Sequence, residues 1–312
     1  MIAIFTIVAP VFGIIAIGYA AGRWNLLSPN ASQGISDFAF TLAIPALLCR
    51  TIATAEFGSL SPLAVWGSFY TAGFATWAAA TVLSRYVLRR PAEDAPAIAM
   101  TATFGNTVML GIPLALGTYG APASAVIALI LSIHAPIWWL TGMLHAQATG
   151  GQPGQPLLSI LQTLGRDLVR NPIVIGIMVG VLWRVTGLTL PAALNRLLEL
   201  MAQAGIPTSL VALGLTLVRF EIKGQMPTLL SVVALKLVLM PTIAWAMATA
   251  VFGLDALTTG VIVILAAVPT GANAFLFAAR IDRAVSSASG AVALGTLIAA
   301  LSAAFIVSLL HG

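Results

Sequence analysis

Two stretches of the sequence decide the fold: ATFGNTVMLGIPLALGTYG at residues 102–120 and AAVPTGANAFLFAARID at residues 266–282. Both are mostly apolar, yet both carry proline, glycine and asparagine near the middle. A proline has no N–H to donate to the helical carbonyl four residues earlier, and its ring clashes with that carbonyl. Pro113 therefore removes the helical hydrogen bond to the Met109 carbonyl. We therefore predict two membrane-spanning helices that unwind at mid-membrane, where an unwound backbone is tolerated only against protein or a water-filled cavity.

The composition of the whole chain is that of a membrane protein. Of its 312 residues, 60% are hydrophobic and 7% are charged, and the mean hydropathy is +1.03. A soluble domain carries about 25% charged residues, which excludes an ordinary soluble enzyme, a nucleic-acid-binding protein and a disordered chain. The single cysteine, Cys49, excludes a disulfide framework and a cysteine-based zinc site. We expect no metal and no cofactor.

Ten apolar stretches are long enough to cross a hydrocarbon core of about 30 Å as helices. They cover residues 2–21, 33–53, 63–84, 97–117, 121–143, 171–188, 193–217, 228–252, 257–279 and 286–310. If the N-terminus lies outside, the inner loops hold ten Lys and Arg residues and the outer loops hold three. This bias predicts that both termini are periplasmic in a bacterial inner membrane. Residues 144–169 would form a short cytoplasmic link.

The two halves of the chain repeat each other at an offset of 161 to 163 residues. Pro10 matches Pro172, AIPALL at 43–48 matches GIPTSL at 205–210, and 105–113 falls opposite 268–275. Five spans per repeat is an odd number, so the second copy enters the membrane upside down. The predicted fold is therefore all-α, with ten transmembrane helices in a 5+5 inverted repeat, 1–143 and 170–312, and broken spans four and nine. Secondary transporters have this architecture, with the substrate site near the midplane.

Each break leaves a half-helix N-terminus with unpaired N–H groups, which suits an anion such as a carboxylate. Asn106 and Asn273 are neutral donors at the two breaks, and apolar residues near Pro45, Trp139 and Pro207 would hold the body of the ligand.

Ionisable residues inside a span are functional candidates. Lys236 is either a fixed cation that bonds half-helix carbonyls, in the place of a sodium ion, or a lysine that snorkels to the membrane surface. His134 either carries a proton or bonds a carboxylate, or is a core histidine. Asp37 lies near the start of its span and is expected to be interfacial.

At these residues the sequence resembles the auxin efflux carrier family, which contains plant PIN auxin carriers and bacterial carboxylate carriers. The likeness covers nearly the whole chain apart from the link. It is carried by RWNLLSPNASQGISDFAF at 23–40, AIPALL at 43–48 (with Pro45 and Leu48), NTVMLGIP at 106–113, RNPIVIG at 170–176, Lys236 five residues before Pro241, and VPTGANAFLFA at 268–278.

The resemblance implies a fold related to the bile-acid/sodium symporters. A scaffold domain would comprise spans 1, 2, 6 and 7 and a transport domain spans 3–5 and 8–10, with elevator-like movement of a carboxylate and a homodimer. Position by position, the first crossover would hold Asn106, Gly111, Ile112 and Pro113, the second Pro269 and Gly271, and the fifth-helix cavity positions His134 and Trp139. Plant members have proline where this chain has Gly105, and an Asp/Lys pair in a third span that is uncharged here.

The function expected from these features is secondary active transport of small organic anions, an auxin-like indole carboxylate or a malonate- or malate-type carboxylate. The expected partners are the substrate and membrane lipid, without nucleic acid. Two alternatives are a sodium-coupled bile-acid-type symporter and a non-transporting membrane sensor. A third, an intramembrane hydrolase, would use Ser286 or Ser287 with His134 or His145, but no third orienting residue is evident. We therefore do not expect an enzyme.

Overall fold

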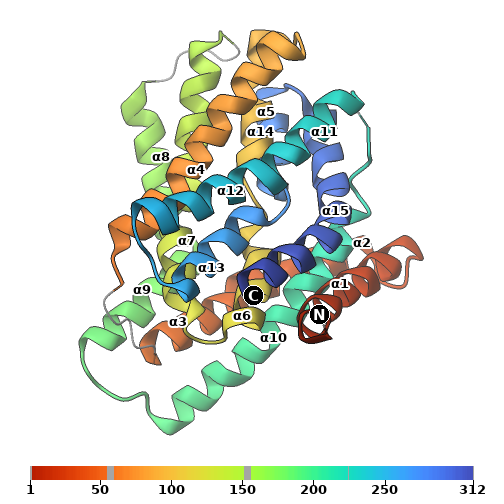
Figure 1. The fold of residues 1–312 in the computed structure, drawn as a ribbon. Coiled ribbons are helices and arrows are strands. Elements are labelled where there is room, and N and C mark those ends of the chain that lie inside the picture. Colours follow the sequence, from red (N-terminus) through yellow and green to blue (C-terminus); the bar gives the residue numbers. More distant parts are fainter. Residues whose placement is uncertain (1, 55–59, 151–155, 224, 312) are drawn as a thin grey trace. The chain divides into compact units, whose positions relative to one another are not determined.

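The computed structural model describes residues 2–54, 60–150, 156–223 and 225–311, and every regular element in these ranges is helical (Figure 1). The α-helices are α1 (Ile2–Arg23), α2 (Pro29–Phe38), α3 (Ile44–Thr54), α4 (Pro62–Val82), α5 (Ala95–Thr103), α6 (Ile112–Tyr119), α7 (Ala123–Ala148), α8 (Leu157–Arg170), α9 (Pro172–Val185), α10 (Ala192–Leu217), α11 (Met226–Ala234), α12 (Met240–Ala246), α13 (Ala256–Ala267), α14 (Ala272–Ile281) and α15 (Val285–His311). Between them lie π-helical segments at Ala39–Ala43, Leu83–Val87, Thr107–Gly111, Leu235–Leu239 and Met247–Val251, and a 3₁₀ turn at Ala92–Asp94.

Among the described residues, five continuous helices are long and apolar enough to cross a membrane. They are Asn30–Thr54, Ala123–Ala148, Ala192–Leu217, Met226–Val251 and Val285–Leu310, and each coincides with a predicted span. The pair α8 and α9, bent by 64°, is a sixth candidate. Other predicted spans contain shorter apolar helices, such as α13 and α14. The described part of the chain is thus all-helical and has the several apolar helices of a multi-pass membrane protein. The count of ten spans remains a prediction.

The expected link at 144–169 is largely helical. Helix α7 continues to Ala148, and α8 covers Leu157–Arg170 before meeting α9 at 64°. Apolar residues at helical spacing, such as Ile160, Leu164 and Leu168, alternate with polar ones along α8. A hydropathy average does not detect this amphipathic pattern, so this helix is absent from the sequence-based prediction.

The helices group into two compact units. Unit 1 contains residues 1–61, 108–132 and 166–219, and unit 2 contains residues 62–107, 133–165 and 220–312.

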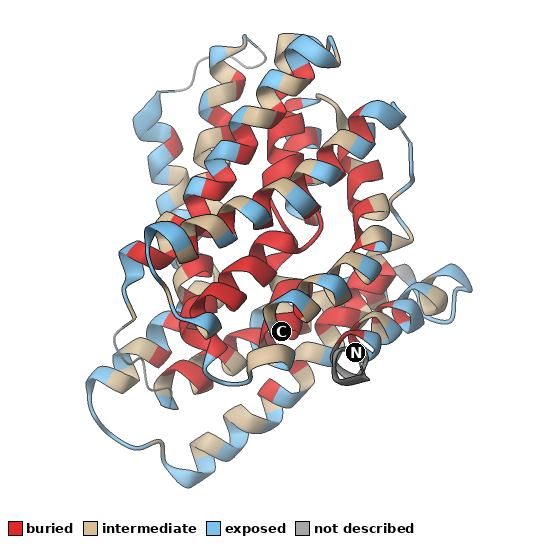
Figure 2. Cartoon of the chain, in the orientation of Figure 1, coloured by how far each residue is buried: buried red, intermediate tan, exposed pale blue. Residues whose placement is uncertain are grey.

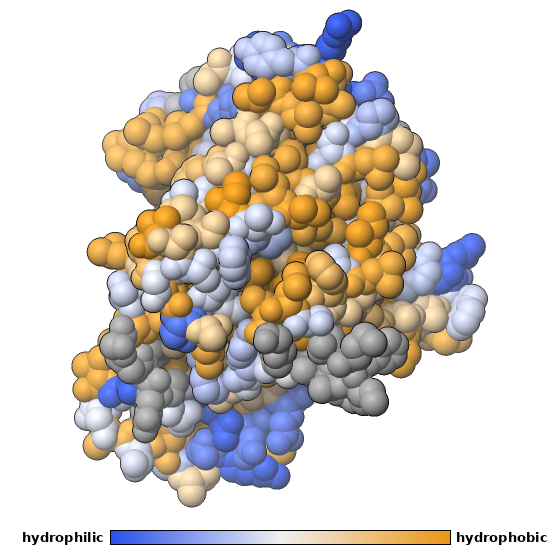
Figure 3. All heavy atoms as spheres, in the orientation of Figure 1, coloured by the Kyte–Doolittle hydropathy of each residue, from blue (hydrophilic) through white to orange (hydrophobic). Residues whose placement is uncertain are grey.

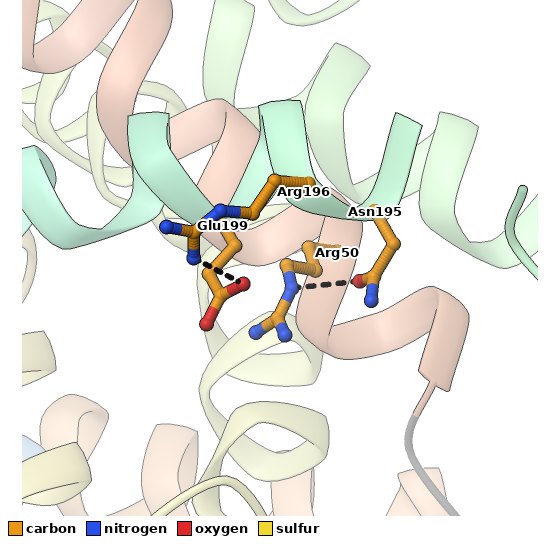
Figure 4. A network of polar contacts seen from close by, with 4 residues as sticks. All are labelled: Arg50, Asn195, Arg196 and Glu199. Atoms are coloured by element: carbon orange, nitrogen blue, oxygen red, sulfur yellow. Dashed lines mark hydrogen bonds and ion pairs between the residues drawn. The ribbon is translucent and has the colours of Figure 1, made fainter. Parts of the chain in front are cut away.

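In unit 1, α1 packs on α10, and α3 packs on α9 and α10. The contact between α3 and α9 needs glycine, because a Cβ on Gly176 would lie 2.6 Å from the Pro45 carbonyl oxygen. Where α3 ends and α10 begins, Arg50 Nε donates to Asn195 Oδ1 at 2.9 Å, and Arg196 pairs with Glu199 at 3.0 Å (Figure 4).

In unit 2, α5 and α13 form the buried centre. All nine residues of α5 are buried, as is α13 from Thr258 to its end (Figure 2). Helix α4 packs on α5, α12 and α13, and α15 packs on α11, α13 and α14. The outer faces of α11 and α15 expose large apolar side chains, including Leu230, Leu297 and Leu301 (Figure 3). A membrane protein presents such faces to lipid.

Three π-helical segments end two residues before a proline: Ala39–Ala43 before Pro45, Thr107–Gly111 before Pro113, and Leu235–Leu239 before Pro241. Because the proline ring crowds the carbonyl four residues earlier and provides no N–H for it, the helix widens by one residue instead of breaking. The prediction that Pro113 opens the fourth span is therefore corrected. The non-helical residues are 104–106, upstream of the proline.

Two segments of unit 2, residues 83–90 and 247–254, share an unusual backbone. Each begins with a π-helical segment, and the sixth residue donates its N–H to the first carbonyl, at 2.9 and 3.0 Å. The eighth residue donates to the second carbonyl at 2.8 Å in both segments. The seventh residue has a left-handed backbone, Arg89 with φ 51° and Gly253 with φ 57°. The two segments begin 164 residues apart, just outside the predicted offset of 161 to 163, and the inverted repeat stays a prediction.

Candidate substrate-binding site

Two interrupted helices meet inside unit 2. Helix α5 ends at Thr103 and the chain resumes helical structure at Thr107, while α13 ends at Ala267 and α14 begins at Ala272. The two extended stretches pair in antiparallel fashion through a bridge between Gly105 and Thr270. The Asn106 N–H donates to the Pro269 carbonyl at 2.7 Å, and the Gly271 N–H donates to the Phe104 carbonyl at 2.9 Å. Backbone groups released by the two breaks therefore satisfy one another, as a low-dielectric environment requires.

The close approach of the two stretches explains their glycines. A Cβ on Gly271 would lie 3.0 Å from the Gly105 carbonyl oxygen, and one on Gly105 would lie 2.9 Å from Val268 Cγ2. The Thr270 hydroxyl donates to the Thr101 carbonyl at 2.8 Å, which satisfies a carbonyl in the last turn of α5. These contacts hold the two breaks against each other, and we call residues 104–107 and 268–273 the crossover.

Lys236 lies directly beside the crossover. Its side chain is 1% exposed, and Nζ donates to the Ala266 carbonyl at 2.6 Å and to Met240 Sδ at 3.2 Å. A Cβ on Gly105 would be only 3.0 Å from Nζ, so glycine there leaves room for the amino group. Ala266 is in the last turn of α13, where carbonyls lack helical partners and the helix dipole is negative. Within the described ranges, Lys236 forms no ion pair.

His134 on α7 is enclosed by aromatic rings. Its ring centroid lies 4.8 Å from that of Phe104, 5.6 Å from Phe69, and 6.4 Å from both Tyr70 and Trp138. The residue is 3% exposed, and neither ring nitrogen has a hydrogen-bond partner among the described residues. Because Phe104 belongs to the crossover, the imidazole lies one side chain away from it. A buried polar group without a partner is costly and marks a place where a proton or a ligand could bind.

The two predicted amide donors differ in their surroundings. Asn106 is 7% exposed and lies in the paired stretch, whereas Asn273 is the second residue of α14 and is exposed. Trp139 is half-buried; its ring meets Phe277 edge-on at 5.5 Å, and the Arg280 guanidinium lies 5.6 Å from its centroid. Unit 2 thus brings together the following predicted site residues: Asn106, Pro269, Gly271, Asn273, His134, Trp139 and Lys236.

The remaining predicted site residues belong to unit 1. Pro45 and Leu48 are buried on α3, and Gly111, Ile112 and Pro113 are buried at the start of α6, whereas Pro207 on α10 is exposed. Asp37 is exposed on α2 and accepts a hydrogen bond of 2.8 Å from the Gln33 side chain one turn earlier. The interfacial position of Asp37 stays a prediction.

The features needed for hydrolysis are not found together in the described ranges. Ser286 and Ser287 begin α15 without a hydrogen bond to a histidine, and the His145 Nδ1 atom accepts from the Trp77 indole at 3.2 Å. No group of three or more His, Cys, Asp and Glu side chains that could hold a metal ion lies in the described part of the chain.

Three features of the site do not follow from the motifs alone. These are the aromatic enclosure of His134, the bond from Thr270 to α5, and the stacking of Arg280 on Trp139. Two glycines in the sequence mark places where a large aromatic side chain packs closely against a helix. A Cβ on Gly142 would lie 2.7 Å from the Phe277 ring, and one on Gly73 would overlap Trp138, so each small residue accommodates a large aromatic on a neighbouring helix.

Comparisons with known proteins relate the chain to membrane transport proteins. The profile of the family described as "Membrane transport protein" matches residues 3–307. A protein of Rhizobium meliloti named "Putative malonate transporter" is 25% identical over 98% of this chain and 94% of its own length. Auxin efflux carrier component 3 of Arabidopsis thaliana is 24% identical over 44% of this chain, and the mouse lysosomal cholesterol signaling protein is 23% identical over 66% of it. These matches cover 21% and 25% of the plant and mouse proteins, respectively.

The family profile spans nearly the whole chain, and the relatives include auxin efflux carriers, so the resemblance seen in the sequence is confirmed. The chain belongs to the membrane transport protein family, the family of the auxin efflux carriers.

Proposed function

We propose that this protein is a secondary active transporter of small organic carboxylates that works by elevator-like alternating access in a bacterial inner membrane. The observation that carries the proposal is the crossover: two broken helices joined by backbone hydrogen bonds. Beside it lie a buried lysine that donates to the Ala266 carbonyl and a buried histidine whose ring nitrogens have no hydrogen-bond partner among the described residues. In secondary transporters, discontinuous helices of this kind form the substrate site at the midplane. A relative that is matched over 94% of its length is named "Putative malonate transporter", and malonate is a dicarboxylate.

An anion is the ligand that this arrangement favours. The first N–H groups of α14, at Ala272 and Asn273, have no carbonyl four residues earlier within the helix and carry the positive end of its dipole. Lys236 donates to a carbonyl at the opposite, negative end of α13. In this proposal the positive charge of Lys236 neutralises the partial negative charge of the carbonyls at the end of α13. The positive N-terminal end of α14 is then available to attract the carboxylate. Asn106 and Asn273 orient it.

The same role for Lys236 bears on ion coupling. A cation bonded to the end of a broken helix does what a bound sodium ion would do, so we propose that transport does not require sodium. His134 is our candidate for a proton-carrying group, because its imidazole is buried beside the crossover with both nitrogens free of protein partners among the described residues.

We assign the transport domain to unit 2, which contains both breaks, and the scaffold to unit 1, and we propose a homodimer with periplasmic termini. The other residues predicted for the substrate from the sequence, which are Pro45, Leu48, Gly111, Ile112, Pro113 and Pro207, belong to unit 1.

Uptake of labelled malonate into proteoliposomes tests the proposal. Asn106→Ala and Asn273→Ala should each lower the initial rate at least tenfold, the scale expected for a lost hydrogen bond to a charged ligand. Asn30→Ala is the matched control, since Asn30 is exposed on α2, outside the crossover. Near-normal uptake by both crossover variants, when folded, would refute the proposed site.

A further inference from the structure

One face of α14 has an unusual composition. Asn273, Leu276 and Arg280 follow each other at spacings of three and four residues, so they lie on the same side of the helix. All three are exposed, while Ala274, Phe277, Ala278 and Ile281 of the same helix are buried. Asn273 lies within the predicted span 257–279, where an asparagine that faced hydrocarbon would be costly, and polar residues in membrane helices face protein or water. Arg280 follows directly at the end of this span. The exposed face of α14 is therefore expected to border an aqueous route.

Arg280 is fixed on this face by an aromatic platform. Its Cζ atom lies 5.6 Å from the centroid of Trp139, and Trp139 in turn meets the buried ring of Phe277 edge-on at 5.5 Å. The absent side chain of Gly142 makes room for Phe277, since a Cβ there would lie 2.7 Å from its ring. The position of Arg280 is therefore set by a packed stack that runs through two helices of unit 2.

The contacts of Arg280 leave its donors available. A cation–π contact pairs none of the five N–H donors of a guanidinium with a hydrogen-bond acceptor. Within the described residues Arg280 forms no ion pair, unlike Arg90 and Arg196, which pair with Asp94 and Glu199. A planar guanidinium held in this way can bind a carboxylate through two parallel hydrogen bonds.

The position of this guanidinium along the helix matters. Side chains on a helix lean toward its N-terminus, and the ring that Arg280 stacks on also contacts Phe277, one turn earlier. Phe277 follows Asn273 by four residues, which corresponds to about 6 Å along the axis of α14. A short dicarboxylate could place one carboxylate at Asn273 and direct the other toward Arg280.

We propose that Arg280, held over Trp139, is a second anion-binding point that makes the transporter select dicarboxylates over monocarboxylates. This inference rests on the proposed function, because it assumes that the carboxylate binds at the crossover. It assigns to Arg280 a role in substrate choice.

The test compares malonate with acetate, which has a single carboxylate, in uptake by proteoliposomes containing the full-length protein. Arg280→Gln should raise the KM for malonate at least tenfold, as expected for a lost charge-assisted hydrogen bond. The kinetics of any acetate uptake should change less than twofold. Arg280→Lys keeps the positive charge but loses the two parallel N–H donors of the guanidinium, so its KM for malonate should lie between those of wild type and Arg280→Gln. Arg283→Gln is the matched control: it removes the same charge three residues later, where no aromatic contact is seen among the described residues.

Each outcome is decisive. If Arg280→Gln and Arg283→Gln have the same KM for malonate, Arg280 contributes only general positive charge and the inference is wrong. It is also wrong if Arg280→Gln lowers kcat equally for both substrates, since that indicates a structural role. Trp139→Phe provides a second, milder change, expected to raise the malonate KM in the same direction by weakening the stack. If the wild-type protein transports neither class of anion, the proposed function fails and the inference fails with it; if it transports malonate with Arg280→Gln unchanged, only the inference fails.

Discussion

Replacing Gly105 with alanine perturbs the crossover at its tightest point. The new Cβ would lie 2.9 Å from Val268 Cγ2 and 3.0 Å from both Cε and Nζ of Lys236, where carbon atoms normally keep about 3.5–4.0 Å. Val268 is β-branched and stiff, and moving Lys236 would break its 2.6 Å bond to Ala266. Overpacking of this kind costs about 1–3 kcal/mol. At about 2–4 °C per kcal/mol, the scale for chains of 150–250 residues, the expected fall in melting temperature is on the order of 5 °C.

The assay is thermal unfolding of the purified protein in lipid nanodiscs, followed by malonate uptake in proteoliposomes. Gly295→Ala is the matched control: Gly295 on α15 also faces the crossover, but a Cβ there would lie 3.4 Å from Pro269 Cβ, an ordinary contact. Gly105→Ala should lower both stability and uptake, while Gly295→Ala should leave the melting temperature within about 1 °C of wild type. If Gly105→Ala behaves like Gly295→Ala, the crossover is not packed as described.

Two further predictions concern charged groups in unit 2. Lys236→Met should lower carboxylate uptake at least tenfold, because it leaves a buried carbonyl of α13 without its charged donor. The control is Lys223→Met, which removes an exposed lysine. Equal uptake by both variants would show that Lys236 has no special role. Asp255→Ala should cost about 1 kcal/mol at neutral pH, since Asp255 caps α13 by accepting from the Thr258 N–H and hydroxyl, whereas Asp255→Asn should retain most of that stability. Burial acts to raise the pKa of Asp255, but the hydrogen bonds from Thr258 outweigh it and hold the pKa below its usual value. The part of the capping contribution that depends on the charge of Asp255 is therefore present above about pH 4 and is lost as the pH falls through the folded-state pKa. In pH-dependent unfolding, a difference between wild type and Asp255→Ala that grew below pH 4 would contradict this reasoning.

Much of the fold follows from local features of the sequence. Five predicted spans coincide with long apolar helices because uninterrupted apolar runs leave the backbone no alternative to a helix in lipid. The interruption of the fourth and ninth stretches was also indicated by their glycines and prolines. The sequence did not indicate where the fourth stretch is interrupted. A wider helical turn accommodates Pro113 without a break, whereas the break lies at Gly105, where the missing side chain lets two backbones approach each other.

The parts of the site that escaped prediction depend on contacts between distant segments. That Thr270 would bond to Thr101, or that Arg280 would lie over Trp139, depends on how α14 packs against α5 and α7, which no local pattern specifies. The enclosure of His134 likewise needs rings from α4 and α7 and from the crossover. Helix α8 was missed for a different reason, since its apolar residues are periodic but not continuous.

The most direct test of the central claim is a current measurement on solid-supported membranes with proteoliposomes containing the full-length protein. Malonate, malate, indole-3-acetate and acetate would be applied at two pH values, with and without sodium. We predict a current for at least one carboxylate that persists without sodium and disappears in Asn106→Ala, and a pH dependence would implicate His134. A current that requires sodium would contradict the role proposed for Lys236. The absence of both current and labelled-substrate uptake for every anion would contradict carboxylate transport itself.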